Sequence, residues 1–80
     1  MEIKVGSIVR SIAGHDKGDL QLVVGLDNGY AYVADGKLRK VEKPKKKKLK
    51  HLQGSNYLTD KKFSENYQIR EILMENTKRV

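Results

Sequence analysis

Positive charge is concentrated in one short segment of the sequence, residues 37–50. This segment contains nine Lys or Arg residues and a single acid, Glu42, and so carries +8, whereas the whole chain of 80 residues carries +7. A fixed cationic surface attracts polyanions such as nucleic acids, whereas a flexible cationic run can serve solubility alone. Apolar-patterned stretches flank the run on both sides, which favours a fixed surface. The candidate phosphate contacts are Lys37, Arg39, Lys40, Lys45, Lys46, Lys47, Lys48 and Lys50.

Residues suited to catalysis or metal binding are scarce. The chain has no Cys and only two His, His15 and His51, so it lacks the ligands from which most zinc sites are built. Gly-x-Ser-x-Gly, His-Glu-x-x-His and phosphate-binding P-loop patterns are also absent from the sequence. We therefore expect a non-enzymatic protein without a metal site or a cofactor.

Alternating apolar residues predict short β-strands in the first half of the chain. Residues 7–13 and 19–26 each place apolar side chains on one face, which indicates two strands with one buried face each. Gly14 and Gly18 bound the segment between them and permit the backbone angles of a tight loop. Asp27-Asn28-Gly29 predicts a turn that leads into a third strand over residues 30–34.

The dipeptide Asp35-Gly36 predicts a two-residue hairpin turn between strands at residues 30–34 and 37–41. The cross-strand pairs that this turn implies are Val33 with Leu38, Tyr32 with Arg39 and Tyr30 with Val41. Val33 and Leu38 then face the core, while Tyr32 and Arg39 share the other face. That second pair is either a platform on which an unpaired base stacks or a simple cover for the sheet.

Pro44 predicts an exposed connection over residues 42–46, because proline cannot donate a hydrogen bond to a sheet. Residues 49–52 resume an apolar spacing and predict a last short strand. Residues 1–53 are therefore expected to form a mainly β domain of about five strands.

Helical periodicity follows a break at residues 54–56, so residues 54–80 are expected to be a linker and a C-terminal α-helix. The main apolar stripe consists of Ile69, Ile72, Leu73 and Val80, and a second apolar group consists of Phe63, Tyr67 and Met74. The expected N-cap is Ser64 or Thr59, and the basic pair Lys78 and Arg79 suits the C-terminal end. Packing of this helix onto the strands is favoured over a self-association face.

The glycine pattern is similar to that of a known motif. Gly6, Val9, Gly14, Lys17, Gly18 and Val24 resemble the KOW motif, a strand, loop, strand signature of several ribosomal proteins and bacterial transcription elongation factors. Residues 33–40, Val-Ala-Asp-Gly-Lys-Leu-Arg-Lys, and the lysine block extend the resemblance, over roughly residues 5–53, to small bacterial KOW-domain RNA-binding proteins related to a large-subunit ribosomal protein family. This resemblance implies a five-stranded SH3-like barrel that binds RNA in ribosome assembly or translation. The residues it implies for the RNA face are His15, Lys17, Lys37, Arg39 and Lys40.

Together these features predict an RNA-binding protein, with ribosomal RNA as the expected partner. The alternative is an SH3-like protein-interaction module that uses the barrel or the C-terminal helix. No apolar run approaches the ~20 residues of a membrane span, and the first residues lack the apolar core of a signal peptide. We therefore expect a cytoplasmic protein that makes no contact with a membrane.

Overall fold

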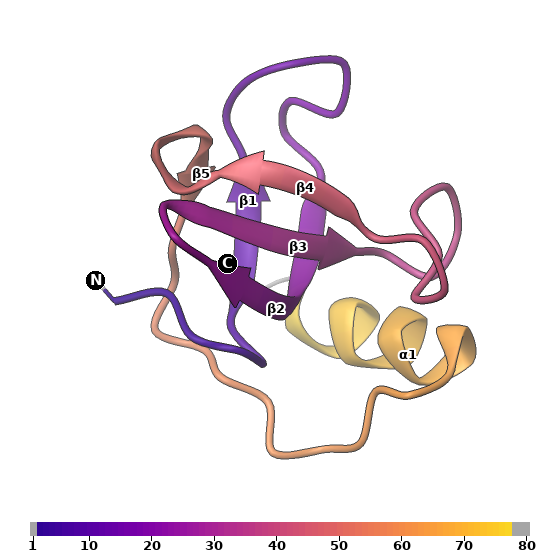
Figure 1. Ribbon diagram of the computed structural model, residues 1–80. Helices are drawn as coiled ribbons and strands as arrows, with labels where there is room; N and C mark the ends of the chain where they lie inside the picture. Colours follow the sequence, from indigo (N-terminus) through magenta and orange to yellow (C-terminus); the bar gives the residue numbers. More distant parts are fainter. Residues whose placement is uncertain (1, 78–80) are drawn as a thin grey trace.

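Short apolar stretches separated by glycine turns build an antiparallel β-sheet, and a C-terminal helix packs against it (Figure 1). The computed structural model describes residues 2–77. In chain order its elements are β1 (Ile8–Ser11), β2 (Leu20–Asp27), β3 (Tyr30–Ala34), β4 (Lys45–Lys48), the 3-10 helix η1 (Leu49–His51), β5 (Leu52–Gln53) and α1 (Asn66–Asn76). The prediction of a mainly β fold with a C-terminal helix is confirmed.

The five strands form one sheet in the order β4-β3-β2-β1-β5, and every neighbouring pair is antiparallel. β4 and β5 are the two edges, and η1 carries the chain from one edge to the other. Leu49 N donates to Gly29 O at 3.0 Å and Ile12 N donates to His51 O at 2.9 Å, so both ends of this crossing are tied to the sheet. Among the described residues no ladder joins β4 to β5, so the sheet is not closed into a barrel.

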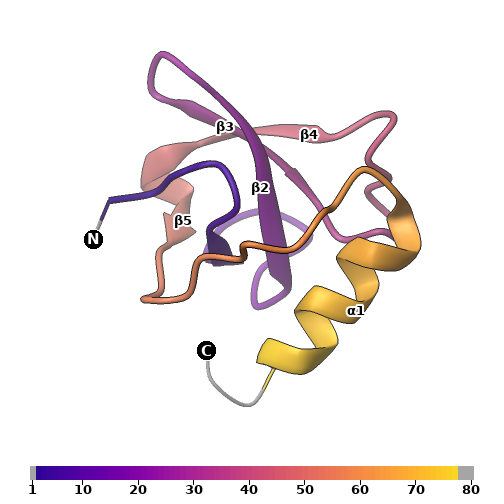
Figure 2. The same ribbon diagram turned by 90° about the horizontal axis from the view of Figure 1, so that it is seen from below.

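Both faces of the sheet are buried at β1 and β2. Successive residues of a strand point to opposite faces, and here alternate residues belong to two separate core clusters. One core cluster contains Ile8, Leu22 and Ala34 of the sheet and Ile69, Ile72 and Leu73 of α1. The other contains Val9, Val23, Ala31, Val33 and Leu52. Figure 2 shows α1 and β5 on opposite sides of β2. The expectation of one buried face per strand is wrong here, whereas the predicted packing of the helix onto the strands is confirmed.

The helix begins later than its apolar pattern indicates, and its N-cap is Glu65. The Glu65 side chain accepts a bond from the Gln68 backbone, and Glu65 N donates to Gln68 Oε1 at 3.0 Å, which completes a capping box. Because this reciprocal pair satisfies the first turn, the predicted caps at Ser64 and Thr59 are wrong. Lys78, Arg79 and Val80 lie outside the described residues.

The predicted hairpin between residues 30–34 and 37–41 is wrong. The Asp35 carboxylate accepts hydrogen bonds from Lys37 N at 2.8 Å and Arg39 N at 2.9 Å, and Asp35 N donates to Arg39 O at 2.9 Å. These bonds close a compact turn at residues 35–39, so its N–H groups are not free to extend a ladder. Leu38, the predicted core partner of Val33, is 85% exposed.

β3 pairs instead with β4, which lies farther along the chain. The observed pairs are Tyr30 with Lys48, Ala31 with Lys47, Tyr32 with Lys46 and Val33 with Lys45. The predicted pairs of Tyr32 with Arg39 and of Tyr30 with Val41 are therefore wrong, and residues 45 and 46 of the expected exposed connection belong to a strand. The last predicted strand is also shorter than expected, because residues 49–51 form η1 and only residues 52 and 53 form β5.

Two helix side chains hold the turn at residues 35–39 and the loop that follows it. Arg70 Nη1 donates to Gly36 O at 2.7 Å, and Asn66 Oδ1 accepts from Val41 N at 2.8 Å. Gly36 has a φ of +78°, and a Cβ added to it would lie 2.4 Å from Asn66 O. The helix therefore fixes the path by which the chain enters β4, and only glycine fits at the closest contact.

We expect Gly36→Ala to lower the free energy of unfolding by about 2–4 kcal/mol, because left-handed strain and overpacking against α1 act together. Gly29→Ala is the matched control, since Gly29 has a φ of +73° but an added Cβ meets nothing within 4 Å. It should cost only about 1 kcal/mol of strain. Urea unfolding of both variants measures the difference, and equal losses would show that the contact with α1 does not constrain the turn.

Candidate nucleic-acid interface

The lysine run is divided between two faces of the sheet. Its central four residues form β4, and alternate side chains of a strand point to opposite faces. Lys46 and Lys48 are exposed and pair with Tyr32 and Tyr30 of β3, so these four side chains share one face, termed the outer face of β3–β4. Lys47, by contrast, is only 6% exposed. The run is thus not one uniform basic surface.

Lys47 is the centre of a buried polar cluster. Its Nζ donates to Asp16 Oδ1 at 2.7 Å, to Ala13 O at 2.9 Å and to Ser11 Oγ. Three donors of the ammonium group are thereby satisfied. The cluster joins edge strand β4 to β1 and to the loop at residues 12–19. This burial removes Lys47 from the predicted phosphate contacts, because its charge is already matched inside the protein.

The Asp16 carboxylate accepts hydrogen bonds from three side chains, those of Lys47, Ser11 and Gln21. Its Oδ1 also accepts from Ser11 Oγ at 2.9 Å, and its Oδ2 accepts from Gln21 Nε2 at 2.7 Å. Burial opposes ionisation of this carboxyl, but the hydrogen bonds from Lys47, Gln21 and Ser11 and the charge of Lys47 outweigh it and hold the pKa of Asp16 well below its usual range. Lys45 Nζ lies 3.9 Å from Asp16 Oδ2 and adds a second cation. Asp16 is therefore charged at any neutral pH.

The outer face of β3–β4 combines cations with an aromatic ring. Lys46 Nζ lies 4.6 Å from the centroid of the Tyr30 ring, the geometry of a cation–π contact. A shallow hollow of about 320 Å³ adjoins this pair. The residues that line it are Ala13, Gly14, Tyr30, Lys45, Lys46, Lys47, Lys48 and His51. No acidic side chain is among these described residues, so the hollow suits a negatively charged ligand.

Four residues of this hollow were not predicted as site residues, namely Ala13 and Gly14 of the loop at residues 12–19, and Tyr30 and His51. Sequence reasoning treated Tyr30 as a packing residue and His51 as a structural or surface residue. Both are half-buried and line the hollow together with the lysines of β4. Tyr30 and His51 come close to the lysines because β3 pairs with β4. The predicted hairpin paired residues 30–34 with residues 37–41 instead, so it gave no reason to expect this proximity. Tyr30 and Tyr32 are alternate residues of one predicted strand, and that spacing was the available signal.

The other predicted site residues do not gather at this hollow. His15 and Lys17 are exposed in the loop at residues 12–19, whose Lys17 N donates to Gly14 O at 3.2 Å. Lys40 is exposed and Arg39 is half-buried in the segment before β4. Lys50 is exposed and lines a separate hollow with Glu2 and Leu49.

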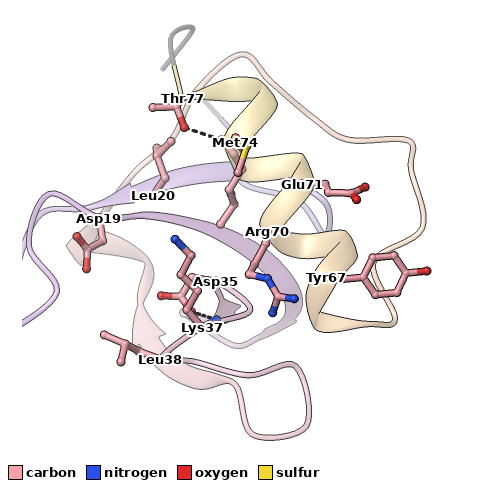
Figure 3. Close-up of a pocket in the computed structure, with 11 residues that line it drawn as sticks. Asp19, Leu20, Asp35, Lys37, Leu38, Tyr67, Arg70, Glu71, Met74 and Thr77 are labelled. Atoms are coloured by element: carbon pink, nitrogen blue, oxygen red, sulfur yellow. Dashed lines mark hydrogen bonds between the residues drawn. The ribbon is translucent and has the colours of Figure 1, made fainter.

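Lys37 lies at a cavity of mixed charge between α1 and the turn at residues 35–39 (Figure 3). This cavity of about 710 Å³ is lined by the acids Asp19, Asp35 and Glu71, the cations Lys37 and Arg70, and several apolar side chains. Three of those apolar side chains are exposed, Leu38 by 85%, Met74 by 74% and Tyr67 by 54%. The carboxylates of this cavity would repel RNA, and its exposed apolar side chains would gain from contact with a protein. The cavity is therefore better suited to binding a protein than to binding RNA.

Comparison of the sequence with protein-family models gives no match, and comparison with curated proteins gives no significant match. Within residues 2–77, no three His, Asp or Glu side chains are grouped so that they could bind a metal ion. None of the helices in the described part of the chain has the length and apolarity needed to cross a membrane.

We expect Lys47→Ala to lower the free energy of unfolding by about 3 kcal/mol, because it leaves the Asp16 carboxylate with only the more distant Lys45 as a counter-ion. Lys48→Ala is the matched control, since Lys48 is the next residue of the same strand and is exposed. Its effect should stay within about 0.5 kcal/mol. Chemical unfolding followed by circular dichroism gives both values, and similar losses would refute a structural role for the buried pair.

The depressed pKa of Asp16 predicts acid sensitivity. The unfolded chain has an ordinary carboxyl with a reference pKa of 3.8 and binds a proton before the folded chain does. The stabilising contribution of Asp16 should therefore be complete above about pH 5 and fall as the pH is lowered further. Unfolding of the wild type and of Asp16→Asn between about pH 6 and pH 2 tests this. The variant should lack that part of the slope, and parallel curves would contradict the assignment.

Proposed function

We propose that this protein is a non-enzymatic RNA-binding protein of the KOW type that contacts RNA phosphates through the outer face of β3–β4. The observation that carries the proposal is the placement of Lys46 and Lys48 beside Tyr30 and Tyr32 on one exposed face. Exposed lysines release condensed counter-ions when they bind phosphates, and tyrosine rings stack on bases of any sequence. Such a surface favours binding with weak sequence preference.

The proposed contact set is narrower than the basic run. It consists of Lys46 and Lys48 of the outer face and His51 beside them at the hollow. Lys45 points to the same face as Lys47 and lies 3.9 Å from Asp16, and His15 and Lys17 do not line the hollow, so these three are peripheral to the set. Lys47 is left out because its ammonium binds Asp16. Lys37, Arg39, Lys40 and Lys50 would extend the electrostatic field without lining the hollow.

The finer fold assignment is part of the same proposal. An SH3-like fold of the KOW type, with its sheet open between β4 and β5, is supported by the strand order β4-β3-β2-β1-β5, by the 3-10 helix between β4 and β5, and by the strand, loop, strand unit of β1 and β2. Ribosomal RNA as the partner, a role in ribosome assembly or translation, and a cytoplasmic location are supported by the sequence resemblance alone.

A second candidate function is binding of a protein partner. It is supported by the exposed side chains of Leu38, Met74 and Tyr67 around the cavity between α1 and the turn at residues 35–39 (Figure 3). Both functions are compatible in one chain, because this cavity and the basic hollow share no lining residue.

We expect the double variant Lys46→Gln/Lys48→Gln to bind a single-stranded RNA more weakly than the wild type. The slope of log affinity against log salt should become shallower by about 1.4, since each phosphate contact on a single strand contributes about 0.7. Filter binding or gel shift at several salt concentrations measures this slope.

The matched control is Lys37→Gln/Lys50→Gln, which removes the same charge from the same run at positions away from the hollow. It should change the slope much less. Equal changes of slope in the two double variants would mean that the affinity for RNA depends on the net charge of the protein and not on the lysines of β4. A wild-type protein that ignores RNA at low salt but retains a peptide or protein partner as salt rises would overturn the proposed function.

A further inference from the structure

An apolar groove of about 720 Å³ adjoins the outer face of β3–β4. It is lined by Val24 and Gly25 of β2, Tyr32 of β3, Val41 and Pro44 of the loop before β4, and Lys62, Phe63 and Ser64 of the segment before α1. That segment crosses β2 on its way to the helix (Figure 2). Val24, Val41 and Phe63 also pack against the buried cluster under α1, so the groove has a fixed floor.

Tyr32 joins this groove to the basic strand. It lies opposite Gly25 on one side and Lys46 on the other. A Cβ added to Gly25 would lie 3.4 Å from Tyr32 Cδ2, so the ring rests against the glycine backbone at the point where the pairing of β2 and β3 is irregular. The absence of a side chain at Gly25 leaves this part of the groove open beside the ring.

The one charged residue among the described residues that line the groove is positive, namely Lys62. Lys46 is the strand partner of Tyr32, and Lys43 precedes Pro44. Two acids are next to lining residues along the chain, and both are engaged in hydrogen bonds. Glu42 accepts from Asn66 Nδ2 at 2.8 and 3.1 Å, and the Glu65 side chain caps α1. A fitting ligand therefore has a flat apolar group flanked by negative charge. An unpaired base of a nucleic acid has this chemistry, whereas a proline-rich peptide lacks the charge.

We propose that the groove binds an unpaired RNA base, which stacks on Tyr32 and Phe63 while the adjoining phosphates lie on Lys46 and Lys62. This inference rests on the proposed RNA binding and adds to it a specific requirement for single-stranded RNA. The groove contains few polar groups at its floor, since Val24, Val41 and Phe63 form it, so any base should be accepted.

The experiment compares a short single-stranded RNA with a strand of the same length that carries abasic residues. The wild type should bind the base-bearing strand roughly 5- to 150-fold more tightly, the range measured for stacking of one base. Tyr32→Leu keeps an apolar side chain but no stacking plane, and it should lose most of this preference. Tyr67→Leu is the matched control, because Tyr67 is an exposed tyrosine of α1 outside the groove, and it should keep the preference.

The outcomes separate the two proposals. Equal, salt-dependent affinity of the wild type for both strands would overturn base binding in the groove but not phosphate binding by the outer face of β3–β4. Failure of the wild type to bind either strand would overturn RNA binding itself. Phe63→Leu serves as a second variant, and the unfolding free energy of each variant shows whether lost preference reflects lost folding. A proline-rich peptide that shifts the ring resonances of Tyr32 and Phe63, when the RNA strand does not, would overturn the inference in favour of a peptide groove.

Discussion

The buried pair of Lys47 and Asp16 determines which way the rest of β4 faces. Because successive side chains of a strand alternate, placing Lys47 inside forces Lys46 and Lys48 outward, beside the tyrosines of β3. The same pair links an edge strand to the loop at residues 12–19, which is far away in the sequence. β4 is an edge strand that pairs only with β3 within the sheet, so this polar cluster gives it a second attachment, to β1 and the loop that follows β1.

The composition of β4 creates a problem of register that the buried pair alone does not solve. Strand register is normally set by the alternation of apolar and polar residues, but the four residues of β4 are all lysine, so a strand shifted by one or two residues would still offer Asp16 an ammonium group. The segments on either side of β4 supply the missing constraint. Leu49 N donates to Gly29 O at 3.0 Å after the strand, and α1 holds Gly36 and Val41 before it. With the strand held at both ends, Lys47 is the lysine that meets Asp16, Ser11 and Ala13 O together.

The sequence allowed prediction of the elements whose signal is local. Apolar alternation indicated β1, β2 and β3, and the stripe through Ile69 and Ile72 indicated a helix packed on the strands. The hairpin failed because Asp35 bonds to the backbone of its own turn, an option equally available to an Asp-Gly pair. The division of the lysine run could not be predicted, since four identical side chains carry no periodicity and the partner of Lys47 lies 31 residues away. The strand that contains Tyr32 was predicted correctly, but the cross-strand partner of Tyr32 is Lys46 and not Arg39.

Lysines on β4 have a physical role that does not depend on the proposed RNA binding. An exposed edge strand invites pairing with another chain, and lysine side chains oppose it. Charge alone therefore explains Lys48 as well as phosphate binding does. Edge protection does not require aromatic rings beside the lysines, nor a cation held 4.6 Å above one of those rings, nor an apolar groove that continues from the other. The combination of Tyr30, Tyr32 and their lysine partners therefore favours the proposed binding surface over a merely protected edge, and it requires that Lys47 face inward.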